Sequence, residues 1–259
     1  DAVGDKLDVI CEGGIHRGTH MLKALSLGAK ACSGGRLYLY ALAAAGQPGV
    51  ERALELYKSE SANVFNNVSN AEITSMIDLI WETYQNDGTV FCCGNGGNAG
   101  FVANLVSDFA LHPFVAEDKS KPLNIKKRFS VIDLTCSSTM MTGLLNDLGA
   151  NYIFSGQVKV HAKPGDLVIG FSGSGNSGNI LASFEEIKKI GGKSLMITRN
   201  KNGKCSPYCD VIVEVPGDSI YPGQTGKNNN NFHFEDCLAK LTHLVTGILK
   251  GRIQNEIKC

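Results

Sequence analysis

Residues 166–177 read DLVIGFSGSGNS, and this stretch decides the fold. An apolar run of strand length, residues 166–171, leads directly into a turn in which serine alternates with glycine, and a helical pattern follows over residues 179–190. A strand that passes through a glycine-rich turn into the N-terminus of a helix has the geometry that holds an anion. The stretch therefore predicts a strand, turn and helix unit with an anion-binding turn.

The same kind of unit recurs along the chain. Residues 89–93 are apolar and run into the turn GNGGN at 94–98, before a helical segment over residues 99–111. The predicted strands lie at residues 89–93, 129–134, 166–171, 194–198 and 211–215. Strands that alternate with helices predict an α/β protein in which a five-stranded parallel sheet is flanked by helices, in three layers.

The composition excludes several classes of protein. With 43% hydrophobic and 19% charged residues among 259, the chain is neither disordered nor a disulfide-scaffolded miniprotein. The 25 basic and 25 acidic residues cancel, so charge gives no reason to expect binding to nucleic acid or to an anionic membrane. No apolar stretch approaches the roughly 20 residues that a membrane-spanning helix needs. We expect a soluble, cytoplasmic protein.

The nine cysteines indicate a reducing compartment. Most lie inside apolar runs, Cys92, Cys93, Cys136 and Cys237 among them, and we expect buried thiols. Cys205 and Cys209 are separated by three residues, and no second Cys or His pair follows at zinc-finger distance. We therefore predict no metal site from the cysteines.

The two glycine-rich turns carry the chemistry. Both would lie at the carboxyl edge of one sheet, where open α/β folds bind ligands. Ser172, Ser174 and Ser177 supply hydroxyl donors, and Gly173 lets backbone N–H groups approach a ligand closely. These groups and a helix dipole predict a neutral phosphate cup that needs no cluster of arginines. The alternative is a polar turn that only caps a helix, because serine and asparagine are favoured there.

An ordered set of motifs over residues 58–259 resembles a known family. The set consists of CGNGG at 93–97, NDLG at 146–149, SGSGNS at 172–177 and a final helix that carries His243. Together they resemble the sugar isomerase (SIS) domain and, within that group, the phosphoheptose isomerases, which interconvert sedoheptulose 7-phosphate and a heptose 7-phosphate. The resemblance implies a flavodoxin-like fold, a phosphosugar substrate and an aldose–ketose isomerase activity.

The resemblance also implies which residues bind the substrate. Ser172, Ser174 and Ser177 would bind the phosphate, while Asn95 and Asn98 would line the sugar site, Asn98 in place of a serine. The full set of predicted substrate-binding residues is Asn95, Gly96, Gly97, Asn98, Asp133, Ser172, Gly173, Ser174 and Ser177.

The catalytic residues are implied in the same way. The family's glutamate falls on Asp108 and the histidine one turn earlier on Asn104, while its catalytic histidine is matched by His243 and a glutamine eight residues earlier by Glu235. Isomerisation needs a base for the proton beside the carbonyl and an acid for the oxygen of the enediol. We predict Asp108 as base or base-orienter, His243 as acid/base and Glu235 as an assisting group. In the alternative, His243 is a core residue and Asp108 a solvated one.

Asn104 bears on the cofactor and on the function class. The family's histidine at this position can join a zinc site, so its replacement weakens the case for zinc, and we expect that no cofactor is required. Asn104 and Asp108 also favour an alternative function, a non-catalytic phosphosugar-binding or regulatory SIS module.

The first 57 residues resemble a different family. CEGGIHRGTH at 11–20 and KALSLGAK at 23–30 are similar to the last two strand–helix units of an FMN-dependent 2-hydroxy-acid oxidase, a TIM barrel. The resemblance implies a βαβα fragment joined to the isomerase-like domain near residues 54–60. Because six of the eight barrel units are absent, we expect neither FMN nor oxidase activity, against a third hypothesis of a flavoprotein. A natural fusion, a chimera and an artefact all fit these residues.

The assembly is predicted from two amphipathic helices and from the resemblance, because SIS domains build their sites between subunits. The stripe from Ile73 to Trp81 and the apolar positions of the final helix, Leu238, Leu241, Leu244, Val245, Ile248 and Leu249, offer more apolar surface than one small sheet needs. We predict a homo-oligomer, a dimer or tetramer. In the alternative, residues 1–57 cover one of these faces and the chain is a monomer.

Overall fold

A computed structural model describes residues 10–11, 31–32, 36–220 and 231–256, with side chains from residue 44 to residue 255. The chain divides into two compact units. One is Asp1–Glu60 with Tyr221–Gly223, and the other is Ser61–Ile220 with Gln224–Cys259. Each unit is described by itself.

The first unit contains a parallel pair of short strands and most of a long helix. β1 (Ile10–Cys11) pairs with β2 (Ala31–Cys32), and α2 (Arg36–Asn66) follows. α2 is kinked before Pro48, because Ala45 and Gly46 are not helical and Gly46 has a φ of 62°. Most of the two motifs at residues 11–20 and 23–30 lies outside the described residues. The predicted join at residues 54–60 falls within α2, which continues through it.

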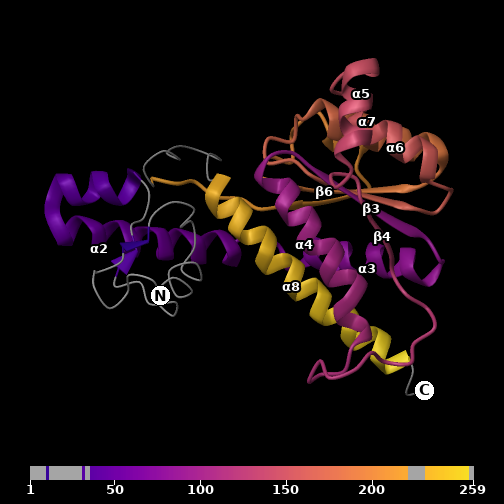
Figure 1. The fold of residues 1–259 in the computed structure, drawn as a ribbon, viewed down its shortest axis with the longest axis horizontal. Helices are drawn as coiled ribbons and strands as arrows, with labels where there is room; N and C mark the ends of the chain where they lie inside the picture. The colour runs from indigo at the N-terminus through magenta and orange to yellow at the C-terminus, as the bar shows by residue number, and fades with distance from the viewer. Residues whose placement is uncertain (1–9, 12–30, 33–35, 221–230, 257–259) are drawn as a thin grey trace, which may run out of the picture. The chain divides into compact units, whose positions relative to one another are not determined.

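The second unit is built on a five-stranded sheet, which confirms the predicted fold class (Figure 1). Its strands are β3 (Thr89–Gly94), β4 (Ser130–Asp133), β5 (Leu167–Phe171), β6 (Lys193–Thr198) and β7 (Val211–Glu214). All four strand pairs are parallel, in the order β4-β3-β5-β6-β7. This is the flavodoxin-like order.

Helices cover both faces of this sheet and complete three layers (Figure 1). On one side lie α3 (Asn70–Gln85), α4 (Gly97–Leu111) and α8 (Asn231–Glu256), with the short 3₁₀ helix η1 (His112–Phe114). On the other lie α5 (Ser138–Leu148), α6 (Tyr152–His161) and α7 (Gly178–Ile190), and a second 3₁₀ helix, η2 (Ser206–Tyr208), precedes β7. Each face of the sheet has its own hydrophobic core. Along β3 the side chains alternate between them, so Cys92 lies in the core beneath α3, α4 and α8, and Cys93 lies in the core on the opposite face.

The apolar stripes on α3 and α8 are buried in this chain's own core. The prediction that these helices leave excess apolar surface for a second chain is therefore mostly wrong. Ile73, Met76 and Ile80 of α3 are buried against the sheet, and so are most of the apolar positions of α8. Only Leu244 and Ile248 of the predicted α8 set stay exposed, at 39% and 38%. A helix that packs on a sheet and on a second helix needs an apolar face this wide.

The cysteines follow the prediction of buried thiols with one correction. Cys92, Cys93, Cys205 and Cys237 are buried, whereas Cys136 is exposed in the turn before α5. Burial raises the pKa of the Cys93 thiol to about 12. A thiol with such a pKa stays protonated at neutral pH, so we assign Cys93 to the hydrophobic core and not to catalysis as a nucleophile. No described helix is long and apolar enough to cross a membrane.

A buried carboxylate fixes the amino ends of the two central strands. Asp166 accepts hydrogen bonds from the backbone N–H groups of Thr89 and Lys163, both at 2.7 Å. Its own backbone oxygen accepts from Lys193 N at 2.8 Å. One residue therefore joins the starts of β3, β5 and β6.

We expect Asp166→Ala to lower the free energy of unfolding by about 2–3 kcal/mol, because two backbone donors lose a charged acceptor. The measurement is urea unfolding followed by circular dichroism. Asp78→Ala is the control, since Asp78 only pairs with Arg252 on the surface (2.7 Å) and its loss costs about 1 kcal/mol or less. Equal losses in the two variants would contradict the role assigned to Asp166.

Candidate functional site

The candidate site lies where the direction of the sheet connections reverses. From β3 the chain passes outward to β4 and then returns to β5 on the other side of β3. Gly94, the last residue of β3, pairs in register with Phe171, the last residue of β5. The connections after these two neighbouring strands leave in opposite directions, and a crevice at such a point is where open α/β sheets bind ligands.

The first turn, residues 94–98, enters α4 through backbone that favours glycine. Gly96 has a φ of 57°, and a Cβ on Gly94 would lie 3.0 Å from the Cβ of Asn98. The Asn98 side chain is buried, and its Oδ1 has no hydrogen-bond partner among the described residues. A buried amide oxygen without a partner is costly and favours a ligand that donates a hydrogen bond there.

The second turn, residues 172–177, is held by its own serines and by the loop after β6. The hydroxyl groups of Ser172 and Ser177 lie 3.0 Å apart, and Ser174 Oγ accepts from Asn176 N at 3.2 Å. Gly175 has a φ of 67°, and a Cβ there would lie 2.5 Å from the backbone oxygen of Asn200. The predicted serine-lined turn therefore exists, and glycine is required at its centre.

A pair of asparagines ties the two turns together. Asn95 Nδ2 donates to Asn179 Oδ1 at 3.0 Å, and Asn179 Nδ2 donates back to Asn95 Oδ1 at 2.8 Å. Asn95 belongs to the first turn, and Asn179 is the second residue of α7, directly after the second turn. Asn95 is thus a structural link between the turns as well as a predicted substrate residue.

Charged side chains also reach the turns, so the predicted neutral cup is wrong. Arg199 follows β6, and its Nε lies 3.1 Å from the position that a Cβ on Gly173 would take. The Glu235 carboxylate lies 2.6 Å from the corresponding position on Gly97. Burial lowers the pKa of Arg199, and the negative charge of Glu235 partly opposes this shift. Sequence reasoning missed Arg199, although its place directly after a parallel strand was a usable signal.

A second cluster is centred on Asp108 of α4. Asn104 Nδ2 donates to Asp108 Oδ2 at 3.1 Å. His243 Nε2 lies 3.6 Å from the same oxygen, and His112 Nε2 lies 3.4 Å from Oδ1. The Asp108 side chain is 11% exposed and that of His243 is 68% exposed. The structure therefore brings the predicted residues Asp108 and His243 close together within one chain, and it adds His112, which was not among the predicted site residues.

The two clusters lie at different ends of α4 within one chain. Asp108 comes eleven residues after Gly97, which is a rise of about 16 Å along a helix. On α8, Glu235 lies beside Gly97 whereas His243 lies beside Asp108, about 12 Å further along. Within one chain, Glu235 therefore belongs with the glycine turns and not with Asp108 and His243.

Asp133 lies at the carboxyl end of β4 and holds its own turn. Its Oδ1 accepts from the backbone N and the hydroxyl group of Thr135, both at 2.6 Å. Its predicted role in substrate binding remains a prediction.

The described residues do not fit a metal at Asp108. No group of three or more His, Cys, Asp or Glu side chains that could hold a metal occurs among them. Asn104 also turns its amide donor toward the carboxylate, where a metal ligand would offer a lone pair.

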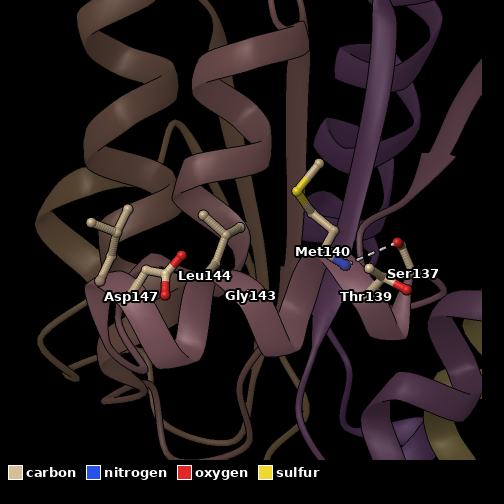
Figure 2. Close-up of a pocket in the computed structure, with 7 residues that line it drawn as sticks. Ser137, Thr139, Met140, Gly143, Leu144 and Asp147 are labelled. Atoms are coloured by element: carbon tan, nitrogen blue, oxygen red, sulfur yellow. Dashed lines mark hydrogen bonds between the residues drawn. The ribbon is translucent and has the colours of Figure 1, made fainter.

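An open hollow of about 530 Å³ lies along the outer side of α5 (Figure 2). It is lined by Ser137, Thr139, Met140, Gly143, Leu144, Asp147 and Leu148. None of the residues of α5 is buried. This apolar hollow is separate from the glycine turns.

Two families match parts of the chain. The FMN-dependent dehydrogenase family matches residues 1–80, and the SIS domain family matches residues 138–229. The first match agrees with the resemblance of the N-terminal segment to an FMN-dependent oxidase. The second match includes the serine turn at residues 172–177.

Individual relatives agree with the second family. The phosphoheptose isomerase of Chlorobaculum parvum is 33% identical over 179 residues, which cover 69% of this chain and 78% of that protein. The structure of a phosphoheptose isomerase from Neisseria gonorrhoeae matches with a TM-score of 0.64 at 19% identity, over 78% of this chain and 99% of that one. One from Francisella tularensis matches with a TM-score of 0.63 at 21% identity, over 78% and 98%. By its fold, its turns and its identity to these relatives, the chain belongs to the phosphoheptose isomerase family.

Proposed function

We propose that the chain is a phosphosugar aldose–ketose isomerase that converts sedoheptulose 7-phosphate into a heptose 7-phosphate. The observation that carries the proposal is the joined pair of turns at the switch point. One turn holds the hydroxyl groups of Ser172 and Ser177, 3.0 Å apart, and the other holds the buried Asn98 Oδ1, which has no partner among the described residues. A relative that is 33% identical over 179 aligned residues is named a phosphoheptose isomerase, which supports this substrate class.

The turns bind and orient the substrate. The hydroxyl groups of Ser172, Ser174 and Ser177 donate hydrogen bonds to the phosphate oxygens, and the N-terminus of α7 adds its dipole. Gly96 and Gly97 let the backbone of the first turn approach the sugar, which Asn95, Asn98 and Asp133 contact through their polar atoms. Phosphate binding at a fixed place positions the carbonyl end of the sugar for proton transfer.

Proton transfer uses the Asp108 cluster. The Asp108 carboxylate takes the proton from the carbon beside the carbonyl while the His243 imidazole donates a proton to the carbonyl oxygen, which gives an enediol. A proton then adds to the former carbonyl carbon, and the hydroxyl group on the carbon that was deprotonated first loses its proton and becomes the new carbonyl. This completes the conversion of ketose into aldose. The reaction is redox-neutral overall, so these steps consume neither FMN nor any other oxidant.

The geometry favours a site that two chains share. About seven bonds join the phosphorus of a 7-phosphate to its second carbon, so the substrate spans about 9 Å when extended. The turns and Asp108 of one chain are about 16 Å apart along α4. We therefore place Asp108 and His243 of one chain opposite the turns and Glu235 of another. Exposed Leu244 and Ile248, beside His243 on α8, offer apolar surface for that contact.

Turnover should depend on the phosphate and on Asp108. Incubation of the full chain with sedoheptulose 7-phosphate should yield an aldose phosphate on chromatography, and unphosphorylated sedoheptulose should react far more slowly. Asp108→Asn should lower kcat by about 10²–10⁴-fold with binding of the sugar phosphate kept, because it removes the base and keeps the shape. A folded protein that binds the sugar phosphate but converts no C5 to C7 ketose phosphate would instead favour the non-catalytic module, for which Asn104 is the specific argument.

The shared site can be tested by mixing inactive chains. The double variant Ser172→Ala, Ser177→Ala lacks the phosphate turn, and the variant Asp108→Ala lacks the base. A mixed dimer of the two combines the intact turn of one chain with the intact Asp108 of the other and so regains one complete site. An equal mixture of exchanging dimers should recover about a quarter of wild-type kcat. Asp108→Ala mixed with His243→Ala is the control, since both defects fall in the same half and no recovery is expected. Light scattering that shows a mass near that of one chain, or oligomers that mix without recovery, would refute the shared site.

A further inference from the structure

Arg199 is built into the second glycine turn from a neighbouring strand. It is the first residue after β6, at the carboxyl edge where both turns lie. Its backbone N donates to Gly173 O at 3.2 Å. Its guanidinium lies over the same residue, because a Cβ on Gly173 would be 3.1 Å from Nε and 3.4 Å from Nη2. The absence of a side chain at 173 is what lets this cation reach the turn.

The start of α8 supplies an opposite charge beside it. Asn231 Oδ1 lies 3.3 Å from that same Cβ position on Gly173, and Asn231 Nδ2 donates to Glu235 Oε1 at 2.9 Å. Glu235 attracts the Arg199 charge across this region. One half-buried cation and one carboxylate are thus held between the two turns, while the chain as a whole carries no net charge.

A phosphate monoester has a doubly negative charge, which hydroxyl and amide dipoles match only in part. A guanidinium presents its donors in a fixed fork that fits phosphate oxygens, and hydrogen bonds to charged groups are the strong ones. A cation partly removed from water acts through a lower effective dielectric constant than one on the surface.

We propose that Arg199 is a charged ligand of the phosphate monoester and gives the switch-point site its preference for the phosphorylated form of its substrate. The inference rests on the proposed function, whose turns hold the same phosphate. It adds a residue from a third strand to a site that the serines alone would leave neutral.

The test measures the Kd of the full chain for inorganic phosphate and for sedoheptulose 7-phosphate by isothermal titration calorimetry. Arg199→Met, which keeps the length of the side chain and removes its charge, should weaken both by about 10–100-fold. Arg199→Lys should lose less, because it keeps a point charge without the fork. Lys201→Met is the matched control. Lys201 lies in the same loop but pairs with Glu214 at 3.1 Å, and its loss should change Kd less than threefold.

Thermal unfolding of each variant checks that it is folded. If Arg199→Met does not fold, the Kd of Arg199→Lys is compared with that of the wild type instead. A Kd for phosphate that stays within threefold of wild type in a folded Arg199 variant would overturn the inference, and so would a wild-type chain that binds neither probe. The readout is binding, so a chain that binds phosphate through Arg199 and isomerises nothing would refute the proposed function and leave this inference standing.

Discussion

The parallel pairing of β3 with β5 is the constraint on which the rest of the second unit depends. Because the chain fills the sheet outward from β3 in both directions, the connections after these two neighbours leave to opposite faces of the sheet. Both glycine turns are placed by this one pairing, down to the register of Gly94 opposite Phe171. The Asp166 carboxylate secures the opposite ends of the same strands.

The close packing of α7 on β5 depends on a glycine, because a side chain at that position would push the helix away from the sheet. A Cβ on Gly170 would lie 2.6 Å from Phe184 Cζ and 2.7 Å from Ile180 Cγ2, so α7 can lie on β5 only because that position has no side chain. The same close approach brings the N-terminus of α7 and its Asn179 within reach of the first turn. The packing of one helix on one strand and the link between two binding turns are therefore a single feature.

The sequence predicted the fold well because its signals were local. Apolar runs of strand length, two of them ending in a glycine-rich turn, gave all five strands of the second unit within one residue at each end. The pattern did not give α6, whose sequence YIFSGQVKVH carries β-branched residues and a central glycine. Gly156 is there because Leu144 of α5 packs against it, which is a tertiary contact that no local pattern encodes.

The candidate site was predicted less completely, for the same reason. The turn residues were recognised from spacing. Arg199 and His112 were missed, because they reach the second turn and Asp108 through contacts between segments distant in the chain or around a helix end. Apolar excess misled the assembly argument, since the width of a helix's apolar stripe does not show whether the sheet, another helix or another chain covers it. Position along α4 is more informative, because about 16 Å of helix separates the first turn from Asp108 within one chain.

The Asp108 cluster shows what replaces the longer glutamate of the resembled family. Asn104 hydrogen-bonds one oxygen of the carboxylate, while both imidazoles stand just beyond ordinary hydrogen-bond distance, at 3.4 and 3.6 Å. A carboxylate one methylene shorter stays close to its own helix, so the group that reaches outward is His243, two-thirds exposed. In the proposed reaction, the imidazole of His243 is then the group that gives the substrate oxygen its proton. The proposed shared site requires an acid that reaches another chain, and an exposed histidine flanked by exposed Leu244 and Ile248 meets that requirement.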